Sequence, residues 1–129
     1  WAQTVGELKI SHQFPGATAT EGDFRDRLCR RFSAEIGKRT NGALKGTVYP
    51  GSSLMKTNAQ FSSVRKGALD MTLVPLSYAG GEVPETNIGL MPGIVTNYDQ
   101  AVSWKKAEVG KALANILADK GVLIVSWIW

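Results

Sequence analysis

Side chains that include amide, hydroxyl and aromatic groups lie at the ends of three of the segments that the sequence predicts to be strands. The residues concerned are Gln13, Phe14, Pro75, Leu76, Ser77, Tyr78, Trp127 and Trp129. The amide and hydroxyl groups can donate hydrogen bonds, and the rings can cover an apolar or planar molecule. In open α/β sheets, ligands bind beyond the carboxyl ends of the strands. We therefore predict a ligand pocket on these loops.

A helix predicted to begin at Thr20 points its N-terminus toward the same region. The positive end of a helix favours a negatively charged group, so the pocket is expected to take a small anion. A second interpretation of the aromatic residues stays open. Trp127 and Trp129 can be core residues, with Phe14 covering that core.

The sequence contains no set of residues that would support catalysis or hold a metal. Its single histidine, His12, and its single cysteine, Cys29, exclude the common zinc patterns. The glycine-rich nucleotide signatures, the Gly-x-Ser-x-Gly elbow and a pair of neighbouring carboxylates are missing. We expect His12 to make a hydrogen bond at a strand end and Cys29 to be a buried helix residue. A nucleophilic Cys29 would need His12 beside it. The prediction is a protein without enzymatic activity, cofactor or metal.

Alternating strand and helix signals define the fold class. Segments with strand character lie at 8–12, 43–49, 69–74 and 122–129, with turns rich in glycine and proline. Helical segments separate them, which gives βα units and a mainly parallel sheet. Residues 122–129 form the most apolar run and are expected to be a central strand. The prediction is an α/β fold with a mainly parallel sheet flanked by helices.

The first helix is predicted over 20–37. Thr20 and Asp23 have the types and spacing of a capping box. An apolar residue at every fourth position gives the expected buried stripe, Phe24, Leu28, Phe32 and Ile36. The other positions include four arginines, Arg25, Arg27, Arg30 and Arg31. They would suit a helix that binds nucleic acid, but with Asp26 and Glu35 among them we expect a solvated face and no nucleic-acid partner.

Later helices are marked by residues that favour helix ends. A helix over 54–66 is expected to end at Gly67 and the last helix at Gly121, because glycine favours the position after a helix end. Asn97 is expected to cap a helix between them, and residues 79–96 are expected to be irregular. The residues that these helices should bury are Leu54, Phe61, Val64, Ala101, Trp104, Val109, Leu113, Ile116 and Leu117.

The composition is that of one globular domain. The chain has 129 residues, 43% hydrophobic and 20% charged, which is enough for a core. The net charge of +4 and the pI near 9.4 suit an anionic partner. No apolar run reaches the roughly 18 residues that span a bilayer. Residues 1–3 fit the stub left after a signal peptide is removed.

Three short elements occur in a fixed order: Thr-x-Gly at 40–42, Tyr-Pro-x-x-x-Leu at 49–54 and Gly-x-Leu-Asp-Met at 67–71. With the first strand and Met91-Pro92, they resemble the DctP-type solute-binding proteins of tripartite ATP-independent periplasmic (TRAP) transporters. The resemblance implies one lobe of a two-lobed periplasmic-binding-protein-like (type II) fold that closes over a small organic acid. It also implies a periplasmic, monomeric protein that delivers its ligand to membrane permease subunits and catalyses no reaction. Family members are longer, so residues 1–129 would be an incomplete N-terminal lobe.

The resemblance also assigns ligand contacts. In chain order these positions are Gln13, Pro75 with Leu76 to Tyr78 beside it, Trp127 and Trp129. Some relatives have a carboxylate at the position of Pro75, so recognition is expected to differ here. The tryptophans and Tyr78 favour an aromatic or otherwise bulky acid. The carboxylate-clamping arginine, the hinge and the second lobe are expected beyond Trp129.

One departure and three other function classes stand beside this resemblance. Met91-Pro92-Gly93 replaces the usual Leu-Pro-Phe, which puts the packing of that loop in question. The main alternative function is the effector-binding domain of a transcriptional regulator or receptor with the same lobe architecture. A small α/β enzyme and a nucleic-acid-binding module are the other two.

Overall fold

A boundary after Val74 divides the chain into two compact units. The computed structural model describes residues 6–129, so the suggested signal-peptide stub at 1–3 lies outside the described residues. Within residues 6–129, no helix combines the length and the apolar character needed to cross a membrane.

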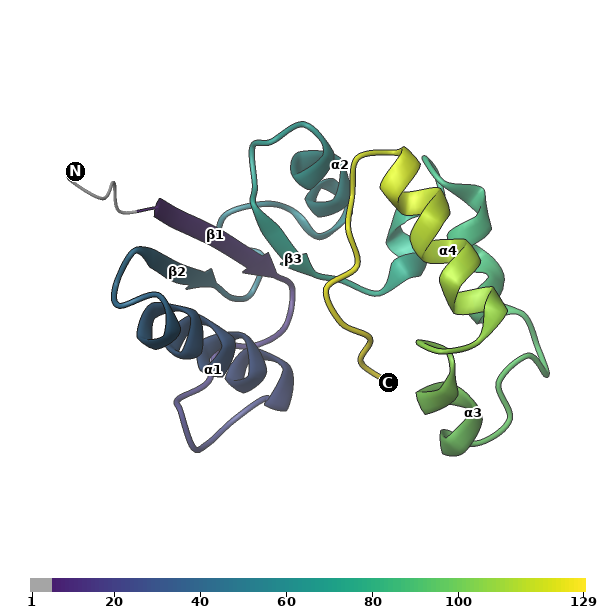
Figure 1. Cartoon of the computed structure of the whole chain (residues 1–129), viewed down its shortest axis with the longest axis horizontal. Coiled ribbons are helices and arrows are strands. Elements are labelled where there is room, and N and C mark those ends of the chain that lie inside the picture. The colour runs from purple at the N-terminus through teal and green to yellow at the C-terminus, as the bar shows by residue number, and fades with distance from the viewer. Residues whose placement is uncertain (1–5) are drawn as a thin grey trace. The chain divides into compact units, whose positions relative to one another are not determined.

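The first unit contains a parallel sheet of three strands in the order β2-β1-β3 (Figure 1). The strands are β1 (Gly6–His12), β2 (Leu44–Tyr49) and β3 (Met71–Leu73). Ile10 in the central strand pairs with Val48 on one side and Met71 on the other. The predicted strands at 8–12, 43–49 and 69–74 and their parallel order are therefore confirmed, with β3 shorter than expected.

One helix covers each face of this sheet (Figure 1). Helix α1 (Phe24–Arg39) connects β1 to β2, and α2 (Gln60–Arg65), preceded by the 3-10 turn η1 (Thr57–Ala59), connects β2 to β3. The two connections run to opposite sides of β1. Because parallel crossovers are right-handed, the two helices must lie on opposite faces.

Helix α1 begins at Phe24, later than the predicted start at Thr20. Its N-cap is Asp23, whose Oδ1 accepts the N–H of Arg25 at 2.9 Å. The hydroxyl at Thr18 accepts the N–H of Glu21 at 2.9 Å and forms a separate turn before the helix. The predicted capping box was wrong because this turn occupies its residues.

The buried stripe predicted for α1 is also wrong. Phe24 is 57% exposed and Leu28 43%, whereas Cys29 is buried. Ser33 Oγ donates to the carbonyl of Gly46 at 2.5 Å, so the helix approaches β2 through small side chains. A Cβ on Gly46 would lie 2.9 Å from that of Ser33, which explains why this close approach excludes larger residues. Leu28 and the half-buried Phe32 and Ile36 line a shallow groove on this helix.

Helix α2 begins later than the predicted start at 54 because residues 51–55 form turns and bends and η1 follows them. Its predicted end is confirmed. Gly67 has φ +79°, a left-handed value that glycine adopts without strain. The N–H of Ala68 donates to the carbonyl of Ser63 at 2.9 Å, as expected after such a residue.

The second unit is helical. It contains the 3-10 segments η2 (Leu76–Ala79) and η3 (Pro84–Leu90) and the helices α3 (Tyr98–Ser103) and α4 (Glu108–Asp119). The predicted cap Asn97 is confirmed, since its Oδ1 accepts the N–H of Gln100 at 2.9 Å. The buried apolar residues are Ala79, Val83, Ala101, Trp104, Leu113 and Leu117.

Residues 122–129 do not form the predicted central strand. No strand of the described sheet pairs with this segment, which runs on from α4 without regular structure. Trp127 and Trp129 pack against Trp104 instead, with ring centroids 6.2 and 5.3 Å away. Apolar, β-branched composition favours a strand only where a neighbouring strand supplies backbone partners, and the three-stranded sheet supplies none here.

Candidate functional site

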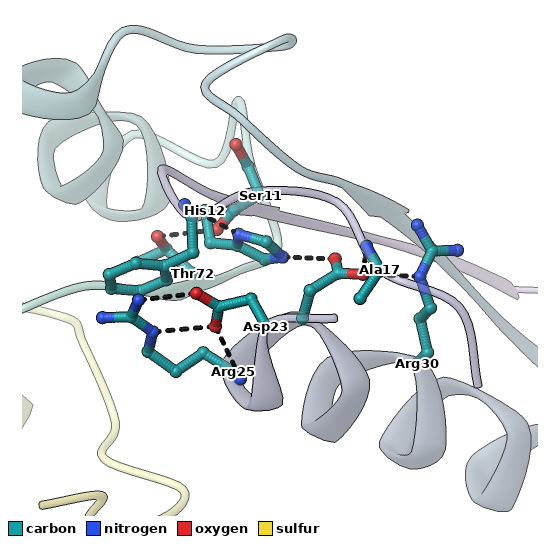
Figure 2. A network of polar contacts seen from close by, with 9 residues as sticks. Ser11, His12, Ala17, Asp23, Arg25, Arg30 and Thr72 are labelled. Carbon is teal, nitrogen blue, oxygen red and sulfur yellow. Dashed lines mark hydrogen bonds and ion pairs between the residues drawn. The ribbon is translucent and has the colours of Figure 1, made fainter. Parts of the chain in front are cut away.

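The carboxyl end of β1 meets the first turn of α1 at a buried polar network (Figure 2). His12 is the last residue of β1, and Asp26 lies in the first turn of α1. Both side chains are fully buried, and His12 Nε2 lies 2.7 Å from Asp26 Oδ1. The expectation that His12 makes a hydrogen bond at a strand end is thus confirmed.

The other ring nitrogen of His12 holds the loop that follows. The N–H of Phe14 donates to His12 Nδ1 at 3.1 Å. A nitrogen that accepts a hydrogen bond carries no proton, so the network assigns the ring proton to Nε2, which donates to Asp26. His12 therefore fixes the backbone of Phe14 and, with it, the position of Gln13.

Asp26 ties the same loop to α1. Its Oδ2 accepts the N–H of Ala17 at 2.8 Å and Arg30 Nε at 2.6 Å. Burial alone would raise the pKa of Asp26, but the hydrogen bonds from Arg30, Ala17 and His12 outweigh it and lower the pKa. The carboxylate stays ionised and holds both ends of the loop 13–17.

A second ion pair lies beside this network. The carboxylate of Asp23 accepts two hydrogen bonds from Arg25, one from Nε at 2.9 Å and one from Nη2 at 2.6 Å (Figure 2). The hydrogen bonds from Arg25 lower the pKa of Asp23 to about 2. The guanidinium carbon of Arg25 lies 3.7 Å from the ring centroid of Phe14. Because Asp23 already occupies the N-terminus of α1, the expectation that this helix end is open to an anion is corrected.

Strand order marks where a ligand would bind in the first unit. The chain moves from β1 to one side and then returns to the other, so the order reverses between β1 and β3. In open α/β sheets the binding crevice lies at the carboxyl ends of the strands at such a reversal. His12 pairs with Leu73 at this edge, and the residues that follow them are Gln13 and Val74. Gln13 Oε1 is buried, and no described residue donates a hydrogen bond to it.

The remaining residues predicted as ligand contacts belong to the second unit. Pro75 directly follows Val74 and is the N-cap of η2, which carries Leu76, Ser77 and Tyr78. Tyr78 is 46% exposed. The structure thus brings Gln13 and Phe14 together on one loop and Pro75 to Tyr78 together on one 3-10 segment.

Trp127 and Trp129 stack with an interplanar angle of 13°. They line a shallow hollow with Tyr98, whose hydroxyl donates to the carbonyl of Trp129 at 2.7 Å, and with Lys105. Their contact with Trp104 shows that they pack within the second unit, and the exposed 39% of Trp129 leaves it available to a ligand as well. Both interpretations of the tryptophans therefore keep support.

Sequence reasoning missed the part of Asp23, Arg25 and Asp26 in this network. The spacing of Asp26 and Arg30 is typical of a surface ion pair, and these residues were assigned to a solvated face. That assignment is wrong for Asp26, which is fully buried. The signal that could have found this network is His12, which lies four residues after Leu8 in an apolar strand. A buried imidazole needs a polar partner, so this position indicates one nearby.

Cys29 behaves as predicted, as a buried helix residue. Burial, together with the charge of Asp26, raises the pKa of its thiol to about 11. A thiol in this state is a poor nucleophile at neutral pH. The described residues contain no group of three histidine, cysteine or acidic side chains that could hold a metal ion.

Residues 16–129 match the family described as bacterial extracellular solute-binding protein, family 7, or DctP. The chain belongs to this family. The family description names extracellular solute-binding proteins, so the predicted family and periplasmic location are confirmed. The named relatives below are solute-binding proteins rather than enzymes, in agreement with the expectation from the sequence.

Individual relatives in family 7 are considerably longer. A solute-binding protein of Albidiferax ferrireducens is 68% identical over 129 residues, which cover 100% of this chain and 38% of that protein. A TRAP periplasmic solute-binding protein of Rhodoferax ferrireducens, solved with bound malonate, is 70% identical with a TM-score of 0.91. That match covers 95% of this chain and 39% of the solved one. The chain thus spans less than two fifths of these relatives, and their shared architecture confirms the α/β fold class.

More distant members share the fold. The 2,3-diketo-L-gulonate-binding periplasmic protein of Escherichia coli is 26% identical over 112 residues, which are 87% of this chain and 34% of that protein. A TRAP periplasmic solute-binding protein of Sulfitobacter, solved with bound β-D-galacturonate, has a TM-score of 0.82 at 22% identity over 93% of this chain and 38% of its own.

Proposed function

We propose that the full-length protein captures a small organic acid in the periplasm and delivers it to the membrane permease subunits of a TRAP transporter. The observation that carries this proposal is the 70% identity to a solute-binding protein that holds malonate. The basic composition of the chain, with a net charge of +4, also suits an anionic ligand. No observation favours the effector-binding domain of a regulator.

The proposed binding edge is the reversal point between β1 and β3. Gln13 follows β1 there, and its buried Oε1 accepts no hydrogen bond from the described residues. A buried amide oxygen normally accepts a hydrogen bond, so a donor group of the ligand, such as a hydroxyl, would complete its set. Phe14 lies on the same loop, and Pro75 to Tyr78 follow β3. Gln13 and Phe14 are the proposed ligand contacts of the first unit, and Pro75 to Tyr78, Trp127 and Trp129 are the proposed contacts of the second unit.

The size of the acid is the finer part of the proposal. The exposed rings of Tyr78 and Trp129 support a bulky or aromatic acid, because flat rings stack on planar ligands. The relative with bound malonate supports a short diacid. The share of the relatives that the chain covers supports a further proposal, that residues 1–129 are one lobe of a longer, two-lobed protein. We also propose that this protein acts as a monomer.

Calorimetry on the full-length protein would test the function. The panel is malonate, succinate, galacturonate and two aromatic acids, benzoate and phenylacetate. We expect at least one acid to bind with a micromolar or lower Kd. Binding of none of the acid classes would refute the function, and a preference for malonate over phenylacetate would refute the aromatic proposal alone.

A matched pair of variants would test the binding edge. Gln13→Ala removes the proposed contact, and Asn58→Ala removes an exposed amide from η1. A lost hydrogen bond between neutral groups costs about 0.5–1.5 kcal/mol, so we expect Gln13→Ala to weaken binding of a hydroxylated acid such as galacturonate about two- to tenfold. Asn58→Ala should bind like the wild type. Equal affinities for both variants would remove Gln13 from the site.

A further inference from the structure

Arg25 is held in a single orientation by two neighbours. Asp23 takes two of its N–H groups, on Nε and Nη2, and the ring of Phe14 lies against the guanidinium plane at 3.7 Å. A planar guanidinium that is both paired and stacked loses little freedom when it makes another contact. Arg25 is therefore preorganised, unlike a free surface arginine.

The donors that Asp23 leaves unused define what Arg25 can still do. A guanidinium has five N–H groups, and three of them, two on Nη1 and one on Nη2, have no hydrogen-bond partner among residues 6–129. The side chain is 36% exposed, so these donors are accessible to a ligand. One N–H of Nη1 and the free N–H of Nη2 are parallel on the remaining edge of the guanidinium, and this fork matches the two oxygens of a carboxylate.

The place of Arg25 in the sheet connects it to ligand binding. It lies in the first turn of α1, which stands at the carboxyl edge of β1 because α1 follows that strand directly. Its stacking partner Phe14 is the neighbour of Gln13 at the point where strand order reverses. Two other arginines of α1 have ion pairs that do not involve the loop residue Phe14. Arg30 donates to Asp26, and Arg39 pairs with Glu35 at an exposed site further along the helix.

The charge of Asp23 limits what Arg25 can contribute to ligand binding. The carboxylate remains charged, so the pair has no net charge and exerts little attraction at long range. The interaction that Arg25 can still make with a ligand is short-range and directional, because it comes from two N–H donors at a fixed position. Such a group selects for an acceptor at one point of the ligand more than it raises the rate of encounter.

We propose that Arg25 contacts a carboxylate of the bound acid through Nη1 and the free N–H of Nη2, with Phe14 and Asp23 as the residues that orient it. This inference rests on the proposed function, because it assumes that the full-length protein binds an organic acid. It adds a specificity-determining residue that lies on α1 rather than on the loops predicted from the sequence.

The test compares two variants of the full-length protein by calorimetry. Arg25→Gln removes the charge and the fork, whereas Arg27→Gln removes an exposed arginine from the same helix. The probe is malonate, or the acid of the panel that binds tightest. We expect Arg25→Gln to raise the Kd about 10- to 100-fold and Arg27→Gln to change it less than twofold. Circular dichroism must show the same melting transition for both.

A second ligand separates direct contact from an indirect effect on the loop. In the monoamide of the acid, a neutral amide replaces one carboxylate without changing its shape. If Arg25 contacts that carboxylate, the wild type should bind the monoamide more weakly than the acid. Arg25→Gln should then bind the monoamide almost as well as the wild type does, because the contact is already lost. The inference would be overturned if Arg25→Gln weakened binding of the acid and of the monoamide by the same factor. It would also be overturned if Arg25→Gln bound the acid like the wild type. A wild type that binds no acid would instead refute the proposed function.

If Arg25→Gln does not fold, Arg25→Lys keeps the positive charge on this turn but loses the planar fork and the stacked contact. We expect its Kd for the acid to lie between those of the wild type and the 10- to 100-fold weaker limit. Wild-type affinity in Arg25→Lys would contradict the proposed two-donor contact.

Discussion

Replacing Asp26 with alanine is expected to destabilise the full-length protein by about 2–4 kcal/mol. The substitution leaves two buried or half-buried donors without their acceptor, His12 Nε2 and the N–H of Ala17. An unpaired buried donor costs about 1–3 kcal/mol. The side chain of Arg30 is 40% exposed and can turn to water, so its lost ion pair adds little.

Urea unfolding followed by circular dichroism at pH 7 would measure this loss. Glu35→Ala is the matched control, because it removes a carboxylate from the same helix whose pair with Arg39 is largely exposed. We expect the control to lose less than about 0.5 kcal/mol. Asp26→Asn keeps one acceptor oxygen for His12 and should lose about 1–2 kcal/mol.

The pH dependence gives an independent check. The pKa of Asp26 is lowered in the folded state, so its contribution is fully present above the unfolded pKa of about 3.9 and is lost as the pH falls through the folded value. The stability gap between the wild type and Asp26→Asn should therefore shrink below about pH 4. An Asp26→Ala variant as stable as Glu35→Ala, or a gap that stays constant under acid, would refute the reasoning.

Two further predictions concern packing. The thiol of Cys29 is buried with its pKa raised to about 11, so a thiol reagent at pH 8 should modify it at least tenfold more slowly in the native protein than in denaturant; equal rates would contradict the burial. A Cβ on Gly110 would overlap the carbonyl oxygen of Trp104, whereas one on Gly89 meets open space. Gly110→Ala should therefore cost about 1–3 kcal/mol and alter tryptophan fluorescence, and Gly89→Ala should do neither; similar thermal melts for the two variants would count against the described packing.

Local signals carried the sequence prediction furthest. Gly67, Gly121 and Asn97 were placed correctly because their preferences arise from their own backbone or side chain, independent of distant residues. The first three strands were also found, since each combines strand composition with turn residues at its ends. These features depend on short stretches that the sequence displays in full.

The wrong predictions concern features that depend on residues far away in the sequence. Phe24 and Leu28 have the correct period for a buried stripe, but α1 meets the sheet through Cys29 and Ser33 because Gly46 permits a close approach. No feature of the helix itself reveals that a glycine lies opposite. Residues 122–129 have strand composition, yet a strand also needs a neighbour in register.

The candidate site was predictable only in part. Gln13 and Phe14 could be placed on a loop after the first strand, since the end of that strand is marked by proline and glycine. Their fixation by His12 and Asp26 depends on a crossover that brings α1 back beside β1. A histidine at a strand end indicates a buried partner but does not say which carboxylate provides it.

The segment 122–129 has a practical consequence for handling this stretch of the protein. It carries no charged residue, and Leu123 and Val125 are 78% and 69% exposed. Uncharged apolar stretches without a strand partner readily form intermolecular β-structure and then fibrillar or amorphous aggregates. We therefore expect the 129-residue polypeptide to lose solubility at high concentration, and a lysine at position 123 to act as a gatekeeper that delays it.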